Sequence, residues 1–287
     1  MTDVLIVMKW PLIACLLLPG MLVYLGLHIV RREVIFIDLA LAQVATLGTI
    51  VCLFLGHEAD DPHNYFWSLG FTLAGALVFT FTRPKRRVGV PQEALIGIVY
   101  VVAAAAGILL LSKGPHGNEE LQRTLVGDLL TVSWPEIWKT AVLYAVIGVV
   151  HFVFRKKFLA LSFDHEHADE KVKRVWLWDF LFYALFGLVV TSFVRIGGVL
   201  LVFSYLIVPA VCANFLASRI SALLAIGWTT ATVASVTGLY LAYQHDLPTG
   251  AAIVCVLGVA LVLAGIASKF TPKGRVTLSP AREDHLR

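Results

Sequence analysis

Residues 10–30 read WPLIACLLLPGMLVYLGLHIV and are followed directly by Arg31-Arg32. The run contains no Asp, Glu, Lys or Arg, and it has the length of about 20 apolar residues that a helix needs to cross the hydrocarbon core of a bilayer. A pair of arginines directly after such a run is typical of a span that ends at the cytoplasmic surface. This stretch therefore predicts a membrane-spanning helix.

Eight further apolar runs follow along the chain, separated by polar loops. We expect nine spans in all, at residues 10–30, 34–56, 65–82, 91–111, 135–154, 176–193, 196–217, 220–243 and 249–267. The predicted fold class is an all-α polytopic membrane protein with about nine transmembrane helices. Only Arg195 and the pair Gly197-Gly198 separate the sixth span from the seventh, and the sequence leaves open whether these are separate helices.

The composition of the whole chain agrees with this reading. Of its 287 residues, 59% are hydrophobic and 15% are charged, against roughly 45–50% and 25% in soluble domains. This balance excludes a soluble enzyme, a disordered chain and a disulfide scaffold. The first run lacks a small-x-small cleavage site, so we expect a retained span and no cleavable signal peptide. We expect one transmembrane domain over residues 1–268 and a cytoplasmic tail over 269–287.

A catalytic site for ATP hydrolysis is not expected in this chain. The phosphate-binding pattern Gly-x4-Gly-Lys-Ser/Thr does not occur in the sequence, and nine spans leave no room for a second domain. If ATP drives transport here, another chain must hydrolyse it. The four cysteines lie inside apolar runs without a Cys-x-x-Cys pair, so we interpret them as small membrane-embedded hydrophobic residues.

Lys and Arg fall mainly into alternate loops. If Arg31-Arg32 are cytoplasmic, most of the 23 basic residues lie on that side, including those at 83–87, 155–157 and 171–174 and those of the tail. This bias predicts an N-terminus outside and a C-terminus inside. The net charge of +4 then belongs to a face at the inner leaflet and does not indicate a nucleic-acid surface.

The predicted outer loops are acidic and contain histidine. The first runs from His57 to His63 and includes Glu58, Asp60 and Asp61, and later outer loops carry His116, Glu119, Glu120, His245 and Asp246. Such groups attract hard and borderline cations. A cation-attracting vestibule and ordinary solvated loops both fit this pattern.

The inner loop over about 158–174 is the longest on its side, and it is amphipathic and charged. It contains Phe163, Asp164, His165, Glu166, His167 and Ala168. A short helix here is expected to dock on a soluble partner; a solvated connector is the alternative. The two histidines among carboxylates leave a regulatory metal site as a further reading.

Several segments in order resemble the permease subunit of the metal-ion ABC importers, the ABC-3 family of zinc, manganese and iron type. Phe163, Asp164, Glu166 and Ala168 match a Phe-Asp-Pro-Glu-x-Ala-like coupling segment, from which His165 and His167 depart. The other matching stretches are QEALIGI at 92–98, LVGDLL at 125–130, GGVLLV at 197–202 with LIVPA at 206–210, and YQHDLPTGA at 243–251. The resemblance covers about residues 31–267.

The resemblance implies a homodimer of permease subunits in a prokaryotic cell membrane, with a pore that works by alternating access. It implies two cytoplasmic ABC ATPase subunits and an extracytoplasmic metal-binding protein as partners. Phe163, Asp164, Glu166 and Ala168 are expected to contact the ATPase. No permanently bound cofactor is expected, because the divalent metal is the cargo and ATP is used by the partner subunit.

The second span departs from the family pattern. The family shows Gly-Asp-x-x-x-His here, whereas this chain has Ile37-Asp38 and then Ala42-Gln43. Asp38 and Gln43 are five residues apart, about 140° around an ideal helix, so they share a face only if a bulge shifts the register. Ionisable residues inside a membrane are functional candidates. We therefore take Asp38 as the metal-ligand candidate, with Gln43, Glu93, His28 and His151 as further candidates for the translocation path.

His28 is expected at a depth similar to that of Asp38, so it is a candidate for the missing histidine ligand. At the outer side, Asp128, His245 and Asp246 are gate candidates, and Asp246 is expected to cap the ninth span. Three other functions fit the spans: an ion-coupled secondary transporter, a permease for a chelate or vitamin, and a non-transporting scaffold or sensor. The sequence does not choose between zinc, manganese and iron.

Overall fold

The computed structural model describes residues 2–57, 62–82, 90–112, 127, 129–163 and 172–270. Within these ranges every regular element is a helix and there is no strand, which confirms the all-α class. In chain order the elements are α1 (Thr2–Arg32), α2 (Ile37–Phe54), α3 (Pro62–Phe81), α4 (Gln92–Leu111), the 3-10 turn η1 (Leu129–Thr131), α6 (Trp134–Val153), α7 (Arg155–Phe163), α9 (Val175–Leu216), α10 (Ile220–His245) and α11 (Thr249–Ser268).

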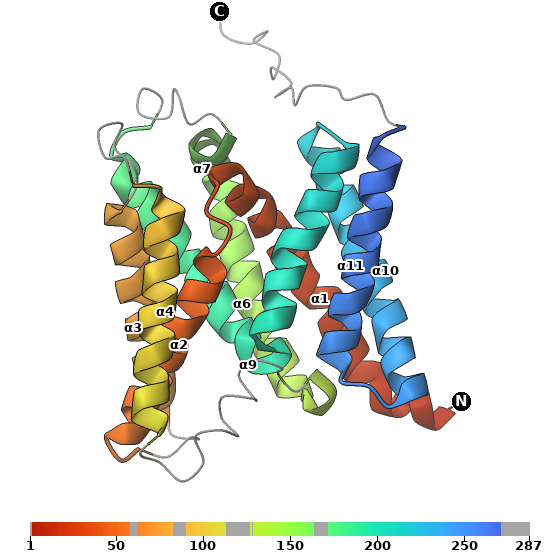
Figure 1. The fold of residues 1–287 in the computed structure, drawn as a ribbon, viewed down its shortest axis with the longest axis horizontal. Coiled ribbons are helices and arrows are strands. Elements are labelled where there is room, and N and C mark those ends of the chain that lie inside the picture. The colour runs from red at the N-terminus through yellow and green to blue at the C-terminus, as the bar shows by residue number, and fades with distance from the viewer. Residues whose placement is uncertain are drawn as a thin grey trace, which may run out of the picture.

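Nine segments of the described chain are long and apolar enough to cross a membrane, as the sequence predicts. The short helix α7 is not one of them. The helices α2, α3 and α4 lie together on one side of the bundle and α10 and α11 on the other, with α1 running obliquely between them (Figure 1). α1 begins at one end of the bundle and α11 finishes at the other (Figure 1), as an odd number of spans requires.

The helix α9 is broken at Gly198, whose backbone has φ 73° and ψ 163°. The rings of Phe193 and Tyr205 lie 6.1 Å apart, centroid to centroid, across this break. A continuous helix would separate two residues twelve positions apart by about 18 Å. The chain therefore reverses here, and α9 supplies the sixth and seventh spans as two halves, Val175–Val194 and Ile196–Leu216.

The conformation of Gly198 is essentially restricted to glycine, and another residue there costs about 1–3 kcal/mol. Gly198→Ala is therefore expected to lower the thermal unfolding midpoint of the purified protein by several degrees, at about 2–4 °C per kcal/mol for a chain of this order of size. The matched control is Gly258→Ala in α11, where an added Cβ has nothing within 4 Å. Equal midpoints for the two variants would show that the break does not need glycine.

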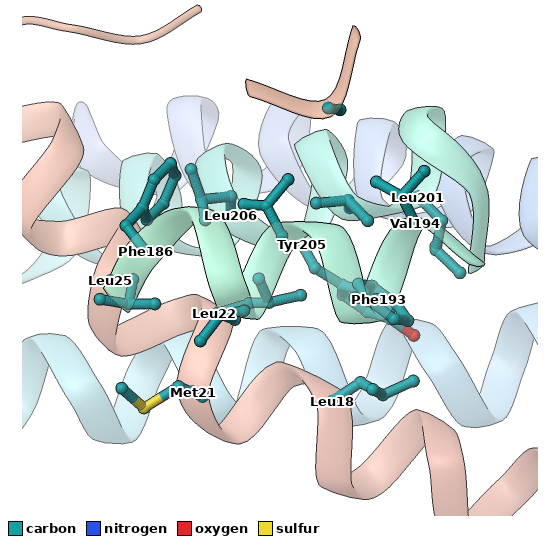
Figure 2. Close-up of a cluster of buried hydrophobic side chains, with 14 of the residues drawn as sticks. Leu18, Met21, Leu22, Leu25, Phe186, Phe193, Val194, Leu201, Tyr205 and Leu206 are labelled. Carbon is teal, nitrogen blue, oxygen red and sulfur yellow. The ribbon is translucent and has the colours of Figure 1, made fainter. Parts of the chain in front are cut away.

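The most buried helices are α1 and the second half of α9. Leu18, Leu22 and Leu25 from α1 gather with Phe186 and Leu206 from the two halves of α9 in one buried cluster (Figure 2). The two helices approach closely at Gly26, where a Cβ atom would lie 1.9 Å from the carbonyl oxygen of Leu206. The peripheral helix α4, by contrast, leaves most of its apolar surface outside the bundle, as expected for a lipid-facing span.

One end of the bundle collects the elements that matter below. The end of α1, the starts of α2 and α4, and the whole of α7 lie there, at the top of Figure 1. We refer to it as the α7 end. The distribution of Lys and Arg predicts that this end is cytoplasmic.

Candidate translocation site

Asp38 and Glu93 are brought to the same end of neighbouring helices. Asp38 lies in the first turn of α2 and Glu93 in the first turn of α4. Asp38 is 1% exposed, and neither of its carboxylate oxygens has a hydrogen-bond partner of good geometry among the described residues. The N–H groups at the start of α2 lie beside it, and the positive end of the helix dipole favours an anion there.

Glu93 on α4 is hydrogen-bonded to the backbone at the start of α2. Its Oε1 accepts a hydrogen bond of 3.0 Å from the backbone N–H of Phe36, while its Oε2 is buried without a partner in the described chain. Glu93 therefore lies beside the first turn of α2, which carries Asp38. Two neighbouring carboxylates repel each other unless a proton or a cation compensates them, and the free oxygens of this pair are available to a positive ion.

The described residues do not by themselves assemble a complete metal site. No group of three or more His, Cys, Asp or Glu with metal-binding geometry occurs within the described ranges. Gln43, the other candidate on α2, is half-buried and lies within a helix that has no interruption. Because no bulge shifts the register, Asp38 and Gln43 do not share a face. Asp38 points into the bundle, whereas Gln43 lies on the partly exposed side of α2 with Leu39 and Thr46.

His28 and His151 belong to a separate cluster and do not join Asp38. Nδ1 of His28 lies 2.8 Å from Oγ of Ser162 on α7, and Nδ1 of His151 lies 3.2 Å from the hydroxyl of Tyr24. The His151 ring stacks on Phe158 with centroids 4.4 Å apart. His28 thus packs against α6, α7 and the first half of α9, so the expectation that it supplies a ligand beside Asp38 is not supported.

A buried ion pair that no local sequence pattern predicts joins α1 to the first half of α9. Arg32 Nη1 donates a 2.8 Å hydrogen bond to Oδ1 of Asp179, and both side chains are 3% exposed. Arg32 Nε donates another of 2.8 Å to Oγ of Ser162. The Lys and Arg distribution predicts Arg32 at the cytoplasmic end, and the structure adds that its side chain is buried. The sequence signal for this pair is Asp179, which like Asp38 is an ionisable residue within an apolar run.

Of the outer gate candidates, His245 and Asp246 lie among the described residues. His245 and Asp246 are exposed at the end of α10. Asp246 is the C-terminal cap of α10, in the left-handed conformation, while α11 begins after Pro248 with no side-chain cap. The prediction that Asp246 caps the ninth span is therefore wrong. The rings of His57 and His63 stack with centroids 5.0 Å apart.

The coupling segment is described only at its start. Phe163 is the last residue of α7, and its ring lies 5.7 Å from that of His28. Asp164, His165, Glu166, His167 and Ala168 lie outside the described residues, as does Asp128. Their predicted roles stay predictions.

Comparisons with known proteins agree with the resemblance. The family model described as the ABC 3 transport family matches residues 5–268. The chain is 29% identical over 260 residues to the manganese transport system membrane protein MntC of Listeria monocytogenes, covering 90% of this chain and 89% of that protein. It is 25% identical over 252 residues to MntC of Halalkalibacterium halodurans, covering 87% and 82%.

A solved structure shares the fold. The chain superposes on a chain of PsaBC from Streptococcus pneumoniae in complex with Fab with a TM-score of 0.74, at 23% identity, over 90% of each chain. The described helices, their order and this likeness fit one another. Since the family model spans nearly the whole chain, this multi-pass membrane protein belongs to the ABC 3 transport family.

Proposed function

We propose that this chain is the membrane subunit of an ATP-driven importer of a divalent transition-metal ion, with manganese as the preferred cargo and zinc and iron as the alternatives. The observation that carries the proposal is the buried Asp38, whose oxygens have no hydrogen-bond partner among the described residues, beside the half-satisfied Glu93. A buried ionisable group without a partner is costly and marks an ion path in a membrane protein. Membership of the ABC 3 transport family supports the same reading.

The donor atoms favour manganese. Carboxylate and amide oxygens suit harder ions such as Mn²⁺, whereas imidazole and thiolate ligands suit zinc. Asp38 and Glu93 offer carboxylate oxygen, and the two histidines of this region contact Ser162 and Tyr24 instead. The relatives named above carry the name of manganese transport systems, which points in the same direction.

The proposed assembly has two copies of this chain, two ATPase subunits at the α7 end and a metal-delivering protein at the opposite end. The orientation rests on the Lys and Arg distribution, with the N-terminus outside. A metal delivered from outside enters a path lined by Asp38 and Glu93, and closure of the ATPases changes the end to which that path opens. Oxygen ligands keep the ion coordinated throughout, because a bare divalent ion in hydrocarbon is prohibitively costly.

Cellular metal content tests the proposal. We expect bacteria that lack this chain to accumulate less manganese than the parent strain at limiting manganese supply, and the wild-type chain to restore the content. Elemental analysis of washed cells for manganese, zinc and iron is the measurement. A fall in zinc or iron alone would overturn the preference for manganese, and unchanged contents of all three metals would contradict the importer.

A further inference from the structure

A buried polar network at the α7 end joins three parts of the chain that are far apart in sequence. We name it the α7 anchor: Arg32 at the end of α1, Ser162 on α7, Asp179 in the first half of α9, and His28 on α1. Arg32 donates to Ser162 and to Asp179, each at 2.8 Å. The Ser162 hydroxyl, having accepted from Arg32, lies 2.8 Å from Nδ1 of His28. All four side chains are buried.

Arg32 is held on several sides at once. Its guanidinium carbon lies 3.9 Å from the centroid of the Phe182 ring, so the face of the group is covered while its edge donates to Ser162 and Asp179. The planar guanidinium presents its donors in a fixed fork, and a buried charge needs its partners. Arg32 at the end of α1 therefore contacts both α7 and the first half of α9 and links the three elements.

On one side the anchor leads to the coupling segment. Ser162 is the residue before Phe163, where α7 finishes, and residues 164–170 follow directly. The contacts of α7 are firm: Phe158, Leu161 and Ser162 are buried, and Nζ of Lys157 lies 3.8 Å from the centroid of the Trp178 ring. A displacement of the segment after α7 must therefore move α7 as a unit or break these contacts.

On the other side the anchor leads to the carboxylates. Arg32 is the last residue of α1, and Ile37 already begins α2. The turn between them is tight: Glu33 adopts the left-handed conformation with φ 57°, the N–H of Val34 bonds the carbonyl of Ile29 at 3.4 Å, and the N–H of Phe36 bonds Glu93. Movement of Arg32 is thus passed to the start of α2, where Asp38 lies.

We propose that Arg32 is a positioning residue that couples α7 to the carboxylate pair, so that a movement of α7 driven by the ATPase changes the access of Asp38 and Glu93. The inference rests on the proposed function. Packed helices change between discrete arrangements, so a small movement of one helix can shift its neighbours to a different arrangement. A residue that only stabilised the fold would affect ATP hydrolysis and transport equally. Loss of a positioning residue is expected to lower transport while ATP hydrolysis continues.

The test is the amount of metal transported per ATP hydrolysed by the complete complex in proteoliposomes, with Mn²⁺ as the probe. Arg32→Lys keeps the charge opposite Asp179 but loses the second donor to Ser162, and Ser162→Ala removes the bridge while it leaves the ion pair. Both are expected to lower the metal-to-ATP ratio by roughly two- to thirtyfold, the range for mutations that alter coupling between sites. ATP hydrolysis should stay near the wild-type rate.

The matched control is Ser204→Ala. Ser204 is also buried, but among the described residues its hydroxyl bonds only the carbonyl of Leu200 in its own helix, at 2.8 Å, so the ratio should not change. If Arg32→Lys folds poorly, Ser162→Ala still decides the matter. An unchanged ratio, or equal losses of transport and hydrolysis, would overturn the positioning role. A wild-type complex that transports no metal would instead refute the proposed function.

Discussion

Replacement of Asp38 by asparagine is expected to reduce metal transport roughly 10- to 100-fold, which corresponds to about 1.4–2.8 kcal/mol of ion binding. The substitution keeps the size of the side chain and removes its charge. Because Asp38 is buried and its oxygens have no hydrogen-bond partner of good geometry in the part of the chain that the structure describes, a neutral amide is easier to bury there than the carboxylate. The variant should therefore fold at least as well as wild type and still fail to transport. Uptake by the complex, normalised to folded protein, is the measurement.

The matched control for this substitution is Glu136→Gln. Glu136 is exposed at the opposite end of the bundle and completes a capping box with Ser133 at the start of α6, a role that glutamine can also fill. The Glu136→Gln variant should transport metal at the wild-type rate. Asp38→Ala should be as inactive as Asp38→Asn. Wild-type uptake by either Asp38 variant at equal expression would remove Asp38 from the translocation path.

Gly26→Ala is expected to have the largest effect on folding. Its Cβ atom would lie 1.9 Å from the carbonyl oxygen and 2.8 Å from the carbonyl carbon of Leu206. These are backbone atoms of the central helix pair, so no flexible side chain can make room. The cost should reach or exceed about 3 kcal/mol, the upper end of ordinary overpacking. Folded yield and the thermal unfolding midpoint in detergent measure it.

Gly20→Ala provides the comparison within the same helix, because an added Cβ at Gly20 has nothing within 4 Å. It should fold like wild type and gain slightly from the higher helix propensity of alanine. If Gly26→Ala were as stable as Gly20→Ala, the close crossing of α1 and the second half of α9 would be wrong.

Hydrophobic length made the spans predictable. A run of about 20 apolar residues has few alternatives to a membrane helix, so all nine spans are found in the described chain with small shifts at their ends. The break between the sixth and seventh spans was harder to see, because a single glycine in an unusual conformation carries it. The pair Gly197-Gly198 marks the place, but only the contact of Phe193 with Tyr205 demonstrates the reversal.

The site was predictable in its residues but less so in their grouping. An ionisable side chain within an apolar run can be found by inspection, which identified Asp38 and Glu93. Which of these residues meet depends on how each helix is rotated about its axis, and the sequence does not give that rotation. His28 was expected beside Asp38 from depth alone, yet it faces α6 and α7.

Arg32 illustrates the same limit from the other direction. By position it belongs with Arg31 among the charges that orient the chain, and the positive-inside rule accounts for it fully. Its partner Asp179 is 147 residues away in the sequence, so no local pattern reports the pair. Long-range polar pairs of this kind require the packed structure.

The most direct measurement of the central claim is Mn²⁺ accumulation by proteoliposomes that contain the purified complex of this chain with its ATPase and that are supplied with the metal-delivering protein. The account predicts accumulation that requires ATP on the α7 side, stops when the ATPase is omitted, and is lost in Asp38→Asn. Accumulation that continues without ATP, or that follows an ion gradient instead, would contradict it and would identify a secondary transporter.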